Sequence, residues 1–237
     1  MMSGKRWGYV VQFFCLLVFF GMSPFLIKMD GRKTMSVSSD SVRSQNVSDE
    51  VKPVGALTFD DGPNASSTPI LLDGLKERKV RATFFLIGEN VEKDENEKIV
   101  KRMYEEGHLI GNHTYTHCNL SKLETGEAKK ELEQPDTVIE KITGKQPVFV
   151  RAPYGELPVD SEQDLNRIYI GWTVDPLDWM TEDTGAVVKT VVEEINPGDV
   201  ILLHDCYPSS VQAAIRIVDL LQGKGYEFVT VDHLIMD

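Results

Sequence analysis

The sequence predicts an α/β domain in which parallel strands curl into a closed or nearly closed barrel. Seven short apolar runs follow residue 52, and most are continuous and rich in β-branched or aromatic side chains. Runs of this kind are typical of parallel strands that are buried on both faces. Helical patterns separate most of the runs, and strands joined by helical crossovers favour a barrel. A doubly wound open sheet fits the same pattern and is the alternative.

The expected strands and helices alternate along most of the chain after residue 52. The strands are expected at 54–59, 82–87, 108–111, 147–150, 168–174, 200–203 and 227–231. The helices are expected at 68–79, 91–106, 123–142, 185–195 and 209–223. Leu71, Leu72 and Leu75 give the first helix an apolar face. Gly107 would cap the end of the second helix. Pro135 predicts a break in the third, because proline lacks the backbone N–H that a helix interior needs.

Residues 7–27 are nearly all apolar and predict a single transmembrane helix that anchors the protein in a membrane. A helix of this length spans about 30 Å, the thickness of the hydrocarbon core of a bilayer. Basic residues lie on both sides of the run, so charge does not set its orientation. A cleaved signal peptide is the alternative, although its apolar core would be shorter. Residues 28–52 are rich in serine and charge and predict a flexible linker to a globular domain at 53–237.

Composition and charge narrow the classes of function. The chain is 41% hydrophobic and 26% charged, which is ordinary for a folded protein. It carries 25 basic and 37 acidic residues, a net charge of −12, and a body with this balance would repel nucleic acid. Three cysteines are too few for a disulfide scaffold. Cys118 and Cys206 are expected to be unbridged thiols that do not bind metal.

Polar residues gather where five of the predicted strands end. The five segments are 58–63, 112–117, 151–155, 175–179 and 202–205. In a parallel barrel, chemistry takes place at the carboxyl ends of the strands, which all lie on one face. Each segment alone is weak support for a site, but five on one predicted face indicate a catalytic centre.

His113 and His117 are spaced four residues apart. On a helix this spacing would place both imidazoles on one face, where they could share a metal ion. The zincin motif has the same spacing but needs glutamate after its first histidine, where this chain has Thr114. Asp60 and Asp61 offer one carboxylate as a third ligand and one to take a proton from a metal-bound water. Two solvated histidines and a simple Asp-Asp-Gly-Pro turn are the alternatives, and the combination favours the metal site.

His204 follows the apolar run 200–203, at the end of a predicted buried strand. A histidine there could donate a proton to a leaving group if a carboxylate kept it charged, and Asp178 is the candidate partner. A capped core histidine is the alternative. Cys118 follows a histidine, as in a cysteine phosphatase loop, but that loop needs an arginine shortly afterwards and 119–126 contains none.

Together these segments resemble the five motifs of the NodB-type polysaccharide deacetylases, carbohydrate esterase family 4. The matching segments are Thr-Phe-Asp-Asp-Gly-Pro at 58–63, His-Thr-x-x-His at 113–117, Arg-x-Pro-Tyr-Gly at 151–155, Asp-x-x-Asp-Trp at 175–179 and Leu-x-His at 202–204. The resemblance covers about 53–235 and implies a distorted (β/α)7 barrel of the TIM type, in agreement with the seven strands expected from the apolar pattern.

The resemblance implies a metal centre and a base beside it. Asp61, His113 and His117 would bind one divalent ion, zinc in the first instance, with cobalt or another divalent ion also known in the family. Asp60 would be the general base, and Arg151 would hold Asp60 in position.

The resemblance also implies a general acid and a substrate pocket. His204 would protonate the leaving group, and Asp178 would orient His204 and keep it charged. The backbone N–H of Tyr154 would help to form an oxyanion hole. Trp179 and Leu202 would line the pocket for the acetyl methyl group.

The activity implied by the resemblance is removal of N-acetyl groups from N-acetylglucosamine units of an extracytoplasmic polysaccharide. The expected tether favours peptidoglycan, with the catalytic domain outside the cytoplasm, or secreted if the segment is cleaved. Chitooligosaccharide deacetylation and acetylxylan O-deacetylation are the alternative activities. A glycan-binding pseudo-enzyme is the non-catalytic alternative, although no motif residue is missing. No protein partner is implied.

Overall fold

A computed structural model describes the globular part of the chain. The described residues are 52–93, 95–159, 161, 164 and 166–236. The predicted membrane segment 7–27 and all but the last residue of the predicted linker 28–52 lie outside them. Within the described part, every helix is too short or too polar to cross a bilayer.

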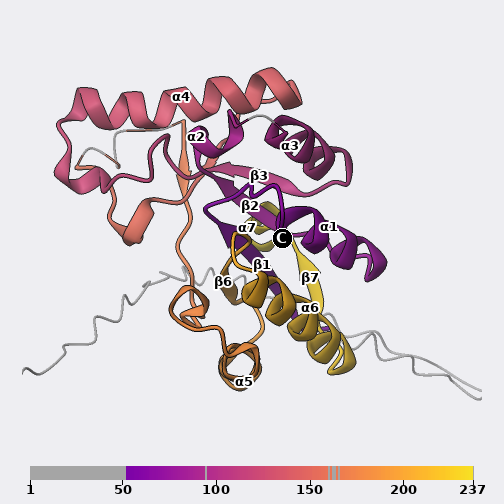
Figure 1. Ribbon diagram of the computed structural model, residues 1–237. Helices are drawn as coiled ribbons and strands as arrows, with labels where there is room; N and C mark the ends of the chain where they lie inside the picture. The colour runs from indigo at the N-terminus through magenta and orange to yellow at the C-terminus, as the bar shows by residue number, and fades with distance from the viewer. Residues whose placement is uncertain (1–51, 94, 160, 162–163, 165, 237) are drawn as a thin grey trace, which may run out of the picture. The chain divides into compact units, whose positions relative to one another are not determined.

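The strands form one parallel sheet that curls into a half-barrel (Figure 1). They are β1 (Val54–Asp60), β2 (Thr83–Leu86), β3 (Leu109–Asn112), β4 (Phe149–Val150), β5 (Ile168–Tyr169), β6 (Val200–His204) and β7 (Glu227–Val229). Each lies within or beside a range predicted from the sequence. Most are shorter than predicted at one or both ends, because the apolar runs extend beyond the residues that pair.

The strands lie in the order β5-β4-β3-β2-β1-β6, and β7 pairs with the start of β1. The register places Asp60 beside His204 across β1 and β6, which brings two predicted site residues to the same strand ends. Closure is incomplete. Between the β5 segment and β6, a single bridge joins Val174 to Ile201 in the described residues. The barrel that was expected to be closed or nearly closed is therefore a curled sheet with a weak seam, and a doubly wound strand order does not form.

Most of the helices cover the outside of the curled sheet, and the last one packs through Val231 against Ala56, Phe85 and Phe149. The helices are α1 (Thr68–Glu77), α2 (Gly88–Val91), α3 (Asn96–Glu105), α4 (Thr125–Thr143), α5 (Thr184–Glu194), α6 (Pro208–Gly223) and α7 (Val231–Met236). The single helix predicted at 91–106 is two helices, α2 and α3, and α7 was not predicted. Short 3₁₀ helices lie at η1 (Leu120–Lys122), η2 (Pro153–Gly155) and η4 (Asp178–Met180).

The predicted break at Pro135 is wrong, because α4 runs unbroken from Thr125 to Thr143 with Pro135 inside it. A proline in a helix interior costs about 3 kcal/mol. Burial offsets this cost, since Leu132, Ile139 and Pro135 itself are buried, and one buried aliphatic side chain contributes about 1.5–3 kcal/mol. The packing is close: a Cβ added at Gly88 of α2 would lie 3.2 Å from the Pro135 ring.

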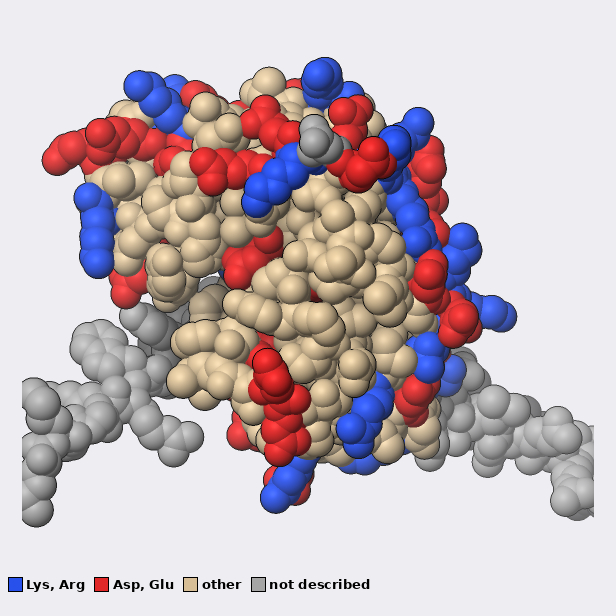
Figure 2. Space-filling model, viewed as in Figure 1, with Lys and Arg blue, Asp and Glu red and all other residues tan. Residues whose placement is uncertain are grey.

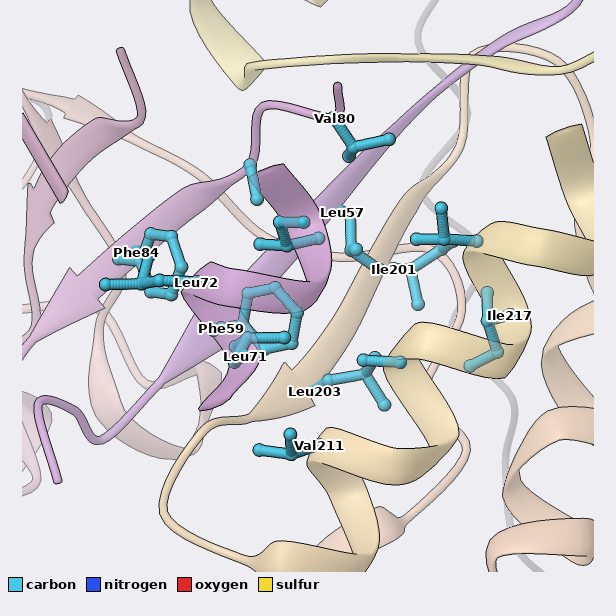
Figure 3. Packing of buried hydrophobic residues seen from close by; sticks show 14 of the residues in the cluster. Leu57, Phe59, Leu71, Leu72, Val80, Phe84, Ile201, Leu203, Val211 and Ile217 are labelled. Atoms are coloured by element: carbon cyan, nitrogen blue, oxygen red, sulfur yellow. The ribbon is translucent and has the colours of Figure 1, made fainter. Parts of the chain in front are cut away.

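The main hydrophobic core lies between the outer face of the sheet and helices α1 and α6 (Figure 3). Leu57 and Phe59 of β1 point into this core, beside side chains of α1, β6 and α6. Side chains alternate along a strand, so Thr58 and Asp60 point to the opposite face, into the curl of the sheet. The apolar side chains of β1 thus hold the strand in the core, and the polar side chains on its other face point to the site.

Charged side chains alternate in sign on the surface seen in Figure 2. Lys and Arg lie beside Asp and Glu along the rim of this face, and the surface between them is mostly uncharged.

At the amino end of the sheet, His108 is buried and its Nδ1 accepts a hydrogen bond from the backbone N–H of Ala82 at 3.1 Å. Burial lowers the pKa of His108 to about 4, so the imidazole is neutral.

Candidate active site

A buried arginine connects the strand ends at the bottom of the site. Arg151 follows β4 and is fully buried. Its Nη1 donates to Asp60 Oδ1 at 2.9 Å and to Thr58 Oγ1 at 2.7 Å. Its Nε and Nη2 donate to the carbonyl oxygens of Ile170 and Gly171, at 3.2 and 2.9 Å. Asp60 is 3% exposed, so this pair compensates two charges that burial would otherwise disfavour.

Asp61, His113 and His117 converge at the strand ends. Their ligand atoms all lie within 4.8 Å of one another. Asp61 Oδ1 is 3.5 Å from His113 Nε2 and 3.3 Å from His117 Nε2. This oxygen is buried and has no hydrogen-bond partner among the described residues. An unsatisfied carboxylate oxygen facing two imidazole nitrogens is the arrangement that a divalent cation would complete.

The tautomer of His113 is set by the backbone. Its Nδ1 lies 2.6 Å from the carbonyl oxygen of Arg151, which can only accept, so Nδ1 carries the proton. The Nε2 lone pair is therefore free to face a metal, as in metal sites whose histidine is oriented by a second hydrogen bond. One carboxylate and two imidazoles suit zinc and related ions and leave one position open for water.

The two histidines lie in a loop after β3, and the helix considered from their spacing does not form. Thr114 and His117 have φ of 65° and 58°, in the left-handed region, so the loop turns back on itself and brings the two rings to centroids 5.0 Å apart. Polar contacts from α4 hold the loop. Glu131 of α4 accepts hydrogen bonds from the backbone N–H groups of Tyr115 and Thr116 at 3.0 and 2.9 Å.

Asp61 has an unusual backbone conformation, with φ of 71°. Asn90 supports it, because its Nδ2 donates to the Asp61 carbonyl oxygen at 2.7 Å. Burial would raise the pKa of the Asp61 carboxyl, but the nearby imidazoles of His113, His117 and His204 outweigh burial and lower it. The carboxylate is therefore ionised, as a metal ligand must be.

On the other side of the site, Asp178 holds His204 by both carboxylate oxygens. Oδ1 lies 2.8 Å from His204 Nδ1, and Oδ2 accepts from the His204 backbone N–H at 2.8 Å. Nε2 is left 3.9 Å from Asp61 Oδ2 and faces the metal triad. Burial would lower the pKa of His204, but the hydrogen bond to Asp178 and the charges of Asp178, Asp60 and Asp61 raise it to about 9.

The residues expected to line the substrate pocket differ in their exposure to solvent. Tyr154 lies in η2 with φ of 62° and is 66% exposed, and its ring is 5.0 Å from that of His117. Trp179 of η4 is 51% exposed. Leu202 is buried on β6, two residues before His204 and so on the same face of the strand. Trp179 borders a cavity of about 570 Å³ beside Asp178.

Sequence reasoning missed residues that support the site from behind. Asn112 Oδ1 accepts from the Thr114 backbone N–H at 2.8 Å, and Asn90, Glu131 and Asp205 hold neighbouring loops. Asn112 and Asp205 lie inside polar segments at predicted strand ends, so their positions in the sequence could have marked them as residues of the site. Nothing in the sequence sets Glu131 apart from other helix glutamates. Cys118 and Cys206 are both free thiols, as predicted.

A curled α/β sheet with a His–His–Asp ligand set at its strand ends is the arrangement of a metal-dependent hydrolase. Comparison with known proteins identifies one family. Residues 48–170 match the family model described as polysaccharide deacetylase. The chain is 41% identical over 186 residues to the peptidoglycan-N-acetylglucosamine deacetylase of Bacillus cereus, which covers 76% of this chain and 67% of that protein. The chain belongs to the polysaccharide deacetylase family.

Two further relatives show how far the likeness extends. The chain is 38% identical over 194 residues to the peptidoglycan-N-acetylmuramic acid deacetylase PdaC of Bacillus subtilis, covering 82% of this chain and 41% of PdaC. The solved PdaC structure matches with a TM-score of 0.75, covering 78% of this chain and 90% of the solved chain. A family 4 acetyl xylan esterase from Clostridium thermocellum, solved with a cobalt ion, is 32% identical with a TM-score of 0.72, covering 76% and 89%.

Asp178→Asn should lower the pKa of His204 in the metal-free protein from about 9 to its ordinary value near 6.5 or below, because burial would then act without the carboxylate. A folded-state pKa raised above the unfolded value stabilises the protein fully below about pH 6.5, and this stability is lost as pH rises through about 9. Asp178→Asn should remove that loss. NMR titration of the imidazole signals and denaturant unfolding at several pH values measure both effects.

Asp175→Asn is the matched control, because Asp175 lies in the same loop and its Oδ1 accepts from the Leu177 backbone N–H. An unchanged His204 pKa in Asp178→Asn, or an equal shift in Asp175→Asn, would contradict the assignment.

Proposed function

We propose that this protein is a metal-dependent polysaccharide deacetylase. The observation that carries the proposal is the placement of two acid–base groups around one ligand set. Asp60 lies 3.7 Å from His113 Nε2, and His204 Nε2 lies 3.9 Å from Asp61 Oδ2. A base and an acid thus flank the same ligand set, as hydrolysis of an amide requires.

A divalent ion held by Asp61, His113 and His117 would lower the pKa of a bound water and polarise the acetyl carbonyl. Zinc is the ion we propose, because two imidazoles and one carboxylate suit it, and cobalt is the natural substitute.

The chain's own residues would carry out the proton transfers. Asp60, held by Arg151, would take the proton of the attacking water. The backbone N–H of Tyr154 would donate a hydrogen bond to the oxyanion that develops on the acetyl carbonyl. His204, charged through Asp178, would protonate the sugar nitrogen as its bond to the acetyl group breaks. Leu202 and Trp179 would enclose the methyl group.

The substrate we propose is peptidoglycan, with N-acetylglucosamine as the deacetylated sugar. The Bacillus cereus relative is named for this activity, and PdaC for the neighbouring N-acetylmuramic acid. Chitooligosaccharides and acetylxylan are the alternatives, and the Clostridium thermocellum relative is named for the last of these. A pseudo-enzyme is disfavoured because ligand set, base and acid are all present and in contact distance.

Product analysis on three substrates tests the activity. Incubation of the full chain with zinc should release acetate from peptidoglycan faster than from chitooligosaccharides or acetylxylan. Mass spectrometry of digested peptidoglycan should show the loss of acetyl from glucosamine and not from muramic acid. Acetate release from acetylxylan alone would replace the N-deacetylase with an esterase, and no release from any of the three would favour a binding protein.

The two adjacent aspartates should separate metal binding from catalysis. Asp61→Asn should lose metal affinity, because a ligand charge is removed. Asp60→Asn should keep the metal and lose roughly 10²–10⁴-fold in turnover, because only the base is missing. Metal content by elemental analysis and acetate release measure the two effects, and chelation followed by zinc should abolish and restore the wild-type rate. Equal metal loss in both variants would show that the roles are misassigned.

We further propose that residues 7–27 anchor the protein in the cell membrane, with the catalytic domain on the outer side. The apolar length of the segment supports the anchor, and the location of glycan substrates supports the orientation. Protease added to intact protoplasts should digest the catalytic domain while a cytoplasmic marker stays whole. A catalytic domain protected until the protoplasts are lysed would overturn the orientation, and its appearance in the medium would indicate cleavage.

A further inference from the structure

A further carboxylate lies beside the Asp61–Gly62 segment and takes no part in the chemistry described above. Asp205 follows His204 and is fully buried. Its Oδ2 accepts a hydrogen bond from Thr68 Oγ1 at 2.6 Å, and its carbonyl oxygen accepts one from Ser67 Oγ at 2.5 Å. Thr68 Oγ1 also accepts from the Asn64 backbone N–H at 2.8 Å. These bonds join the end of β6 to the segment between β1 and α1.

The Asp205 carboxylate is packed directly against that segment. A Cβ added at Gly62 would overlap both carboxylate oxygens, so the carboxylate occupies the space that any other residue at 62 would need. Gly62 follows Asp61, whose φ of 71° is rarely adopted by residues other than glycine. Such a conformation persists only where the surroundings over-determine it. The Ile87 backbone N–H also holds this segment, because it donates to the Gly62 carbonyl oxygen at 3.1 Å.

Asp205 is poorly suited to a role in stability alone. Its Oδ1 is buried without a hydrogen-bond partner among the described residues. An unsatisfied buried polar atom destabilises the folded state, and a well-packed apolar residue would avoid that cost. The Asp205 carboxylate instead fills the space beside Gly62, and its one hydrogen-bonded oxygen accepts from Thr68.

We propose that Asp205 is a positioning residue for the metal site, which holds the Asp61–Gly62 backbone so that the Asp61 carboxylate faces His113 and His117. This inference rests on the metal centre of the proposed function. It gives the end of β6 two roles, since this strand end would present His204 on one face and fix the ligand loop with the other.

The test is the metal affinity and the cobalt spectrum of the full chain. Asp205→Ala should weaken zinc binding by about 10- to 100-fold, the usual effect of losing a residue that orients a ligand. The visible absorption of the cobalt-substituted protein should change in shape, because the Asp61 oxygen moves relative to the two nitrogens. Asp205→Asn, which keeps the shape and an oxygen that can accept from Thr68, should restore both. Zinc affinity is measured by competition with a chromophoric chelator.

Two further variants separate positioning from stability. Val218→Ala opens a cavity in the buried face of α6, in the half of the helix away from Asp205, and lowers stability, so its zinc affinity should be unchanged. Thr68→Val removes the hydroxyl donor at nearly constant volume and should weaken zinc binding in the same direction if Asp205→Ala does not fold.

Wild-type zinc affinity and an unaltered cobalt spectrum in a folded Asp205→Ala or Thr68→Val protein would overturn the inference and leave the metal site intact. Equal weakening in Val218→Ala would also overturn it, because the effect would then follow stability. A wild-type protein that binds neither zinc nor cobalt would overturn the metal centre itself.

Discussion

The structure of the site depends on one buried ion pair, between Arg151 and Asp60. An arginine sealed from solvent must have its donors satisfied, and here four hydrogen bonds go to β1 and to the segment after β5. Those bonds cross the interior of the curled sheet close to the seam between β5 and β6, where one isolated bridge joins Val174 to Ile201 in the described part of the chain. The carbonyl of the same arginine orients His113. Removing the charge would therefore disturb the base, a ligand and the closure of the sheet together.

The alternation of β1 explains how a stable core and a polar site share one strand. Leu57 and Phe59 are fixed by helices on the outer face, while Thr58 and Asp60 point inward. Apolar burial on one side thus holds in place the polar groups on the other, whose own hydrogen bonds contribute little net stability. The same division holds on β6, where Leu203 is in the core and His204 faces the site.

The sequence predicted the sheet well because buried parallel strands leave a strong apolar signal that does not depend on distant residues. It picked out residues that the structure brings together, because strand ends carry their polar groups in short segments. It failed at Pro135, where burial contributed by helices elsewhere in the chain outweighs a local preference. It also failed to show the loop conformation of His113 and His117, since the bonds that bend this loop come from Glu131, on a helix that begins eight residues later.

Each proton-transfer group of the site lies beside a neighbour of opposite charge. Burial opposes charge on both proton-transfer groups, so each needs a compensating neighbour. Asp60 has the guanidinium of Arg151, and His204 has the carboxylate of Asp178. His204 can then stay protonated at neutral pH, where a free imidazole would be losing its proton, because its pKa is raised to about 9. Exchanging the partners would place Asp60 beside another carboxylate and His204 beside a guanidinium, so the order of charges along the strand ends matters as much as the residues that carry them.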